Sequence, residues 1–359
     1  MATTTETVPA GMKKVHFSSY EGMTYRLVST SPPRDCTPDE IPIIDLGRIH
    51  GNLEARKALA SEILNAAKTS GFFYIKNHGI PENVTEAAHQ KGKDERFFKL
   101  PEQQKRKLTS NTSAYGYCGF REIHANPNDT KDRKEAFMFH YEPEFDPLYE
   151  GRLDQVPAHV RKHLPKEDFL WTDSGNDAVL PGFKSALLSH WCACLALCRH
   201  LIQVIALGLG LPEDHFDSMT TYPGGDFAVN FYPGHGDDPV EDPDEVGVGA
   251  HTDLQILTLL WQDQHKGLQV LNNSGEWMWA PPVPGTFVVN IGDFLMRLTN
   301  DRLKSTVHRV LQHGREDRIS MPFFFGKDPP AVFSCEIIEP GKSSAVSCLL
   351  APPFHFDVH

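Results

Sequence analysis

The sequence has few cysteines and no long apolar run. Its seven cysteines are scattered over 359 residues without paired Cys-x-x-Cys motifs, so neither a disulfide framework nor a cysteine-based zinc site is expected. No stretch approaches the roughly 18 uninterrupted apolar residues that cross a bilayer. The first residues also lack the basic start and apolar core of a secretory signal. We therefore expect a cytoplasmic protein that does not insert into a membrane.

Basic residues are in deficit as well. Lys and Arg number 35 against 47 Asp and Glu, which gives a formal net charge of −12. Such a chain has no sequence-independent affinity for phosphates, so binding to nucleic acid or to anionic lipid is not expected. Its 40% hydrophobic residues are enough to bury a sizeable core. No feature of the sequence calls for an obligate protein partner.

The composition changes along the chain in a way that predicts four parts. Residues 1–40 carry Thr, Ser and Pro without periodicity and are expected to form a loosely ordered N-terminal arm. Residues 41–180 alternate short apolar strands with helical patterns, which indicates an αβ region that packs on a main sheet. Residues 181–335 are expected to hold a long helix followed by the main β core, and residues 336–359 form a C-terminal segment.

The longest predicted helix runs from Phe183 to about Leu209, where apolar residues recur at three- and four-residue steps. Polar residues occupy its other side, which indicates a packed helix rather than a membrane span. Short strands separated by Gly, Pro and Asp follow, at residues 226–232, 254–262, 267–271, 286–291, 305–312 and 318–325. Strands at this spacing favour an antiparallel sandwich or barrel. The predicted fold class is therefore mainly β with flanking helices (α+β).

Two stretches of this β region contain residues typical of a metal site. His251 and Asp253 lie two apart, so in an extended chain both side chains point to the same side. His308, in another predicted strand, is the candidate for a third ligand. Two His and one carboxylate on one side of an ion leave the opposite positions free, an arrangement suited to iron(II) that binds a co-substrate and dioxygen.

A second set of polar residues indicates that the co-substrate is an acid. Arg318 and Ser320 share one face of a predicted strand, and a guanidinium is the group best shaped for bidentate binding of a carboxylate. Asn230 and Tyr232 project together from an earlier strand. We expect them to complete the same pocket, with the phenol toward a carboxylate and the amide toward the metal.

Together these motifs resemble the iron(II)/2-oxoglutarate-dependent dioxygenase family, in its isopenicillin N synthase-like branch. The ordered set is Asn230-x-Tyr232-Pro233, His251-x-Asp253, His308 after 54 intervening residues and Arg318-x-Ser320. Segments nearer the N-terminus resemble that branch too, namely residues 41–46 (IPIIDL), 71–74 (GFFY), 77–81 (NHGIP) and 97–101 (FFKLP). The resemblance covers about residues 40–330.

The resemblance implies a double-stranded β-helix (jelly-roll) core with defined ligand positions. It implies Fe(II) held by His251, Asp253 and His308, and 2-oxoglutarate held by Arg318, Ser320 and Tyr232, with Asn230 beside them. The implied enzyme uses dioxygen to oxidise a C–H bond of a bulky small organic molecule, with release of succinate and CO2. Specialised metabolism is the expected setting, by analogy with the branch.

The resemblance also nominates residues for a substrate pocket, because in related enzymes the region before the barrel, its last strand and the C-terminal segment cover the iron. Aromatic residues there suit a bulky apolar substrate, although each is equally a candidate for the core. These residues are Tyr117, Phe120, Phe137, Phe139 and Phe325, with Phe354 a further candidate. Arg121 and Lys134 are candidates for an acidic group of the substrate, with exposed surface charge as the alternative.

Three other interpretations remain open from the sequence. The proposed ligands can be polar residues at strand ends that only form hydrogen bonds. An oxidase similar to isopenicillin N synthase itself would use the same metal ligands without 2-oxoglutarate, its Arg-x-Ser pair binding a substrate carboxylate. A non-catalytic protein with this fold would bind a small molecule without turnover. Succinate formation coupled to product would distinguish the 2-oxoglutarate-dependent enzyme from the oxidase that works without 2-oxoglutarate.

Overall fold

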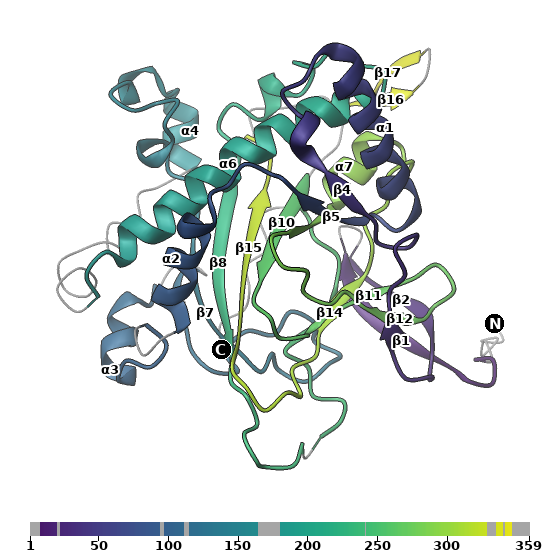
Figure 1. Ribbon diagram of the computed structural model, residues 1–359, viewed down its shortest axis with the longest axis vertical. Coiled ribbons are helices and arrows are strands. Elements are labelled where there is room, and N and C mark those ends of the chain that lie inside the picture. Colours follow the sequence, from purple (N-terminus) through teal and green to yellow (C-terminus); the bar gives the residue numbers. More distant parts are fainter. Residues whose placement is uncertain are drawn as a thin grey trace, which may run out of the picture.

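Two β-sheets form the centre of the molecule (Figure 1). The computed structural model describes residues 8–19, 22–93, 97–110, 115–163, 180–240 and 242–328, with two further strands at 335–339 and 342–346. One sheet has eight strands in the order β4-β5-β13-β10-β15-β8-β7-β6, and the other has seven in the order β2-β1-β9-β14-β11-β12-β3. We call them the major and the minor sheet.

The chain crosses repeatedly between the two sheets from residue 225 onward. Major-sheet strands β8, β10, β13 and β15 alternate along the sequence with minor-sheet strands β9, β11–β12 and β14. This interleaving is the double-stranded β-helix that the sequence predicts, and it brings side chains of the two inner faces together. The bounds of these strands are β8 Gly225–Tyr232, β9 Val248–His251, β10 Leu257–Gln262, β11 Leu268–Leu271, β12 Trp277–Trp279, β13 Phe287–Ile291, β14 His308–Val310 and β15 Arg318–Phe325.

Helices cover the outer face of the major sheet. The longest, α6, lies across β8, β15 and β10, and α1 and α2 pack beside it (Figure 1). Its apolar side chains meet every second residue of the sheet in one large core, so α6 is a core helix although its length and composition alone would allow a membrane span. The helices are α1 Leu53–Thr69, α2 Glu82–Lys93, α3 Glu102–Lys105, α4 Ala158–His163, α6 Phe183–Gly208 and α7 Asp293–Leu298.

The expectation of a loosely ordered arm over residues 1–40 is wrong for most of that stretch. Strands β1 (Met12–Ser19) and β2 (Gly22–Ser29) form an antiparallel hairpin, and β1 pairs with β9 at the edge of the minor sheet. Strand β3 (Arg34–Asp35) pairs with β12. The hairpin is anchored because Phe17 and Val28 are buried in a small apolar cluster with residues of β11 and β12. Two such anchors in a polar stretch are too few for a periodic signal.

The region of residues 41–180 extends the major sheet at both edges. Strands β4 (Ile43–Asp45) and β5 (Phe72–Lys76) join beside β13, whereas β6 (Gly116–Cys118) and β7 (Glu135–Phe139) join beside β8. The predicted αβ order is present, with α1 between β4 and β5. Farther along, β16 (Cys335–Glu339) and β17 (Lys342–Val346) form a separate hairpin, with β16 against α7. Phe354 lies outside the described residues.

Two predicted strands are shorter than expected, and both changes shape the site. The strand expected from residue 254 begins at Leu257, because the backbone before it bonds to the N-terminus of α7 instead of a ladder: the N–H groups of Gly292, Asp293 and Phe294 donate to the carbonyls of Ile256, Asp253 and Leu254. The strand expected over 305–312 is ordered as a ladder only at His308–Val310. Asp253 therefore lies on a tight loop, fixed by backbone hydrogen bonds.

Candidate functional site

Three potential metal ligands converge between the two sheets. His251 ends β9, His308 begins β14 beside it in register, and Asp253 follows on the loop to β10. Oδ1 of Asp253 lies 3.6 Å from Nε2 of His251 and 3.7 Å from Nε2 of His308, and the three ligand atoms all lie within 4.8 Å of one another. The sequence thus predicted a cluster that the fold assembles, and its donor set is the one that suits non-haem iron(II).

Both imidazoles are oriented by the backbone. Nδ1 of His251 lies 2.8 Å from the carbonyl oxygen of Gly249, and Nδ1 of His308 lies 3.1 Å from that of Thr306. A carbonyl only accepts, so in each ring Nδ1 carries the proton and Nε2 keeps its lone pair. The two lone pairs therefore point to the space beside Asp253, as metal ligands require.

The carboxylate of Asp253 is held at one oxygen and open at the other. Oδ2 accepts hydrogen bonds from Oγ1 of Thr258 at 2.5 Å and from Nδ2 of Asn290 at 2.7 Å. Burial favours the neutral acid, but the neighbouring His308 and His251 outweigh it and hold the pKa of Asp253 well below its usual range. Asp253 is therefore ionised at neutral pH, with Oδ1 facing both imidazoles.

The surroundings shift the pKa values of the two histidines in opposite directions. Burial, together with the adjacent His251, lowers the pKa of His308 to about 4. Burial acts on His251 in the same sense, but the hydrogen bond and charge of Asp253 outweigh it and raise the pKa of His251. His251 is also the more exposed of the two, with 23% of its side chain accessible against 10% for His308. Solvent thus reaches the cluster from the side of His251.

Arg318 is fully buried at the start of β15, with both N–H groups of one nitrogen left over. Its Nε donates to the carbonyl of His265 and its Nη2 to Oε1 of Gln262, both at 3.1 Å. Nη1 is buried and has no partner among the described residues. A buried guanidinium with an unused N–H is costly unless an acceptor binds there. These observations fit a cradle for a carboxylate.

Tyr232, Ser320 and Asn230 share the inner face of the sheet with this guanidinium. Tyr232 is the register partner of Arg318, and its ring lies 4.9 Å from the guanidinium carbon. Its hydroxyl lies 3.4 Å from Oγ of Ser320, which pairs in register with Asn230. Lys134 donates from Nζ to Oδ1 of Asn230 at 3.1 Å and is only 8% exposed. Lys134 is thus an interior cation, and the alternative of exposed surface charge is wrong for it.

Four of the five aromatic residues nominated for a substrate pocket lie on the wrong face of the sheet. They belong to the large core beneath the helices, whereas Arg318 and Ser320 point to the opposite, inner face. These four core residues are Tyr117, Phe137, Phe139 and Phe325. Phe120 is 43% exposed and lies against the guanidinium groups of Arg121 and Arg133. The core interpretation is therefore the right one for the four.

Strand alternation identifies two residues of the inner face that were not nominated from the sequence. On β15, Phe324 has the same parity as Arg318 and Ser320, and it is partly exposed while the buried Phe323 and Phe325 face the helices. On β8, Asp226 has the same parity as Asn230 and is likewise partly exposed. The alternation of side chains along a strand, applied from Arg318 and from Asn230, would have identified Phe324 and Asp226 from the sequence.

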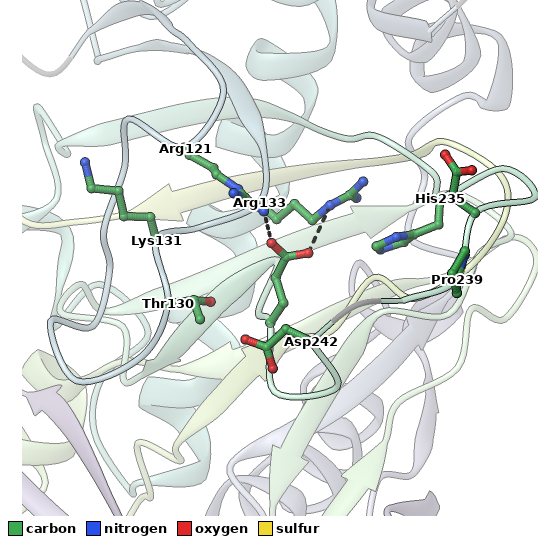
Figure 2. A pocket seen from close by; sticks show the side chains of 9 residues that line it. Arg121, Thr130, Lys131, Arg133, His235, Pro239 and Asp242 are labelled. Carbon is green, nitrogen blue, oxygen red and sulfur yellow. Dashed lines mark hydrogen bonds and ion pairs between the residues drawn. The ribbon is translucent and has the colours of Figure 1, made fainter.

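A cavity of about 690 Å³ lies apart from these residues, between the segment of residues 121–133 and the loop that follows β8 (Figure 2). Arg121 and Arg133 both form ion pairs with Glu245 there, and Nε of Arg133 lies 3.2 Å from Oε2 of Glu245. None of the metal-ligand candidates lines it. The cavity carries charges of both signs, and Arg121 is a surface charge already balanced by Glu245.

Comparison with protein families gives the same class as the geometry. The model described as 2OG-Fe(II) oxygenase superfamily matches residues 223–327, and the model described as non-haem dioxygenase in morphine synthesis N-terminal matches residues 41–167. The chain belongs to the 2-oxoglutarate- and iron(II)-dependent oxygenases. It is an oxidoreductase that uses iron, 2-oxoglutarate and dioxygen, and its family acts on small molecules.

Individual relatives agree with this assignment. The chain is 41% identical over 91% of its length to a 2-oxoglutarate-Fe(II) type oxidoreductase, ppzC, of Metarhizium majus, covering 87% of that protein. It is 33% identical over 83% of its length to hxnY of Emericella nidulans, covering 82% of that one, which carries the same description. Among solved structures, Neurospora crassa T7H in complex with alpha-KG and thymine superposes with a TM-score of 0.68 at 27% identity, over 88% of this chain and 97% of that one.

Proposed function

We propose that His251, Asp253 and His308 hold the iron of this enzyme, and that Arg318, Ser320 and Tyr232 hold 2-oxoglutarate. The observation that carries the proposal is the convergence of two Nε2 lone pairs and one carboxylate oxygen within 4.8 Å of one another. The unused Nη1 of Arg318 supports the second half, because a dicarboxylate supplies the acceptor that this buried donor lacks.

The chain's own groups have separate tasks in this assignment. Arg318 binds the far carboxylate of 2-oxoglutarate, and Tyr232 and Ser320 add hydroxyl contacts to it. Asn230, fixed by Lys134, lies on the same face toward the metal. Iron bound by the three ligands supplies the oxidising chemistry when 2-oxoglutarate and dioxygen are present.

Apolar side chains between the sheets keep bulk water from the ligands. The ring of Phe72 packs edge-on against His308 at a centroid distance of 5.4 Å, and Tyr74 and Val288 lie in the same inter-sheet cluster. Exclusion of water strengthens the electrostatic contacts of the site and prevents side reactions. The partly exposed His251 marks the side from which a substrate reaches the ligands.

We further propose a bulky small organic molecule of specialised metabolism as substrate, oxidised at a C–H bond with release of succinate and CO2. The description of the Metarhizium majus relative supports dependence on 2-oxoglutarate. The oxidase that works without 2-oxoglutarate would bind a substrate carboxylate at Arg318 instead. The net charge of −12 supports an enzyme without nucleic-acid or membrane partners, and we propose the cytoplasm as its location.

Succinate formation tests the proposal. Purified protein with Fe(II) and 2-oxoglutarate should form succinate, faster when an oxidisable compound is added, whereas the His308→Ala variant should lose both iron and turnover. A matched control is His313→Ala, since His313 lies away from the ligands with Nε2 at 3.0 Å from the carbonyl of Glu245. Turnover that persists without His308, or product without succinate, would contradict the assignment.

A further inference from the structure

A polar cluster lies on the inner face of the major sheet. Along this face, Arg318 lies on one side of the proposed metal ligands and the cluster on the other. Phe324 is six residues from Arg318 on β15, which is about 20 Å along a strand. It pairs in register with Thr258, the residue that holds Asp253, and on its other side with Asp226 of β8. Asp226 therefore lies two strands, about 10 Å, from Thr258.

The cluster consists of Asp226, Tyr115 and His140. The hydroxyl of Tyr115 donates to Oδ1 of Asp226 at 3.2 Å, and the rings of Tyr115 and His140 lie 4.8 Å apart. His140 directly follows β7, whose last residue Phe139 pairs with Phe227, the neighbour of Asp226. Three strands thus bring these side chains to one place.

Toward a ligand, these three side chains act as hydrogen-bond acceptors and not as donors. Nδ1 of His140 lies 2.8 Å from the carbonyl of Tyr141 and so carries the ring proton, which makes Nε2 an acceptor. That Nε2 belongs to a side chain only 5% exposed and has no hydrogen-bond partner among the described residues. The hydroxyl of Tyr115 already gives its proton to Asp226.

Asp226 also has no permanently cationic partner among the described residues. No lysine or arginine in the described part of the chain forms an ion pair with it, and burial raises its pKa against the opposing effects of His140 and Tyr115. A carboxylate that is partly withdrawn from water and has no permanent counter-charge is costly to keep ionised, and a bound cation offsets that cost. The partly exposed ring of Phe324 beside it offers an apolar surface for the body of a ligand.

We propose that Asp226, with Tyr115 and His140, binds a protonated nitrogen group of the substrate, such as an amine, amidine or guanidine. The inference rests on the proposed function, because it takes the space between Thr258 and Asp226 as the substrate side of the iron. It narrows the substrate class to organic cations with an apolar body that packs on Phe324. The cation then fixes which C–H bond lies nearest the metal-ligand residues.

Calorimetry with a matched pair of compounds tests the inference. Benzamidine is a cation, and benzamide has nearly the same shape without the charge. The protein loaded with Mn(II) and 2-oxoglutarate should bind benzamidine at least tenfold more tightly than benzamide, and Asp226→Asn should remove this preference. Equal binding, absence of benzamidine binding, or a preference that survives in Asp226→Asn would overturn the inference.

Two further variants guard against misfolding and non-specific charge effects. Tyr115→Phe keeps the carboxylate but removes the hydroxyl that contacts it, so it should weaken benzamidine binding and leave benzamide binding unchanged, which keeps the inference testable if Asp226→Asn melts at a lower temperature. Asp214→Asn makes the same charge change at an exposed position and should leave both affinities as they are. If the wild-type protein binds no 2-oxoglutarate, the proposed function fails; if it binds 2-oxoglutarate without preferring the cation, only this inference fails.

Discussion

Asn290 donates a hydrogen bond of 2.7 Å to Oδ2 of Asp253, and its register partner Thr258 donates to the same oxygen. The two donors come from neighbouring strands of the major sheet, whereas the histidines come from the minor sheet. The carboxylate is thereby locked with Oδ1 toward the imidazoles. The sheet therefore orients the ligand that the loop supplies.

Replacement of Asn290 should weaken iron binding without removing a ligand. Loss of a hydrogen bond to a ligating carboxylate typically lowers metal affinity by about 10- to 100-fold, and we expect this range for Asn290→Leu. Titration of the apoprotein with Fe(II) under anaerobic conditions measures it. Asn273→Leu, at an exposed position, is the matched control. An unchanged affinity in Asn290→Leu would show that the loop alone orients Asp253.

Arg318→Ala should raise the dissociation constant of 2-oxoglutarate by roughly 100-fold, about 2.7 kcal/mol, because two charge-assisted hydrogen bonds are lost. Iron affinity should change little, since Arg318 contacts none of the three ligands. Arg318→Lys keeps the positive charge but lacks the planar guanidinium, so its dissociation constant for 2-oxoglutarate should lie between those of the wild type and Arg318→Ala. Equilibrium binding of 2-oxoglutarate to the Mn(II) form measures all three proteins. The exposed Arg315→Ala serves as control, and an Arg318→Ala protein with normal 2-oxoglutarate affinity would place the cradle elsewhere.

Phe324 and Phe325 are adjacent in sequence and should behave oppositely when shortened. Phe325 is fully buried under the helices, so Phe325→Ala should lower the free energy of unfolding by about 3–5 kcal/mol. Phe324 lies on the inner face and is partly exposed, so Phe324→Ala should cost less stability. It should instead change which compounds raise succinate formation. Urea unfolding and a succinate assay distinguish the two, and the reverse pattern would refute the face assignment.

Stability should fall below neutral pH because of a histidine remote from the proposed iron site. Burial, with the nearby His78, lowers the pKa of His190 on α6 to about 3. Between that value and about 6.5 the unfolded chain binds a proton that the folded chain refuses, so the free energy of unfolding rises with pH in this window. From pH 7 to pH 5 the loss is about 2 kcal/mol.

Urea unfolding at the two pH values checks this expectation. His190→Phe removes the titrating group while filling the space between Phe227 and Phe287. The free energy of unfolding of this variant should therefore fall by about 2 kcal/mol less than that of the wild type between pH 7 and pH 5. Burial lowers the pKa of His78 as well, and its share of the loss remains in the variant. The same pH dependence in both proteins would mean that His190 is protonated in the folded state.

The proposed metal ligands could be nominated from sequence because their spacing is a local property of strands. His251 and Asp253 are two residues apart, and Arg318 and Ser320 repeat that interval, so alternation alone places each pair on one side. The convergence of His308 depended on the family resemblance, since the register of β14 with β9 is a long-range property. The same holds for the β-helix, whose strand order no local pattern encodes.

The proposed substrate side was not predicted because the choice of residues rested on aromatic character. In this sheet most aromatic residues face the helices, where packing gains most, so aromaticity indicates the core rather than the site. Lys134 was misjudged for a related reason. Lysines are mostly exposed, and only the tertiary contact with Asn230 explains a buried one. Asp226 was missed because a lone acid in a strand carries no motif.

The hairpin of β1 and β2 has a consequence for how this protein is handled. Because β1 aligns in parallel with β9 at His251, strands β1 and β2 supply one border of the sheet that carries a proposed ligand. Trimming them as a dispensable leader would leave the backbone of β9 without its neighbour and open to pairing with another molecule. A shortened chain is thus expected to self-associate and to lose its iron together, so an inactive truncated preparation would say nothing about the intact enzyme.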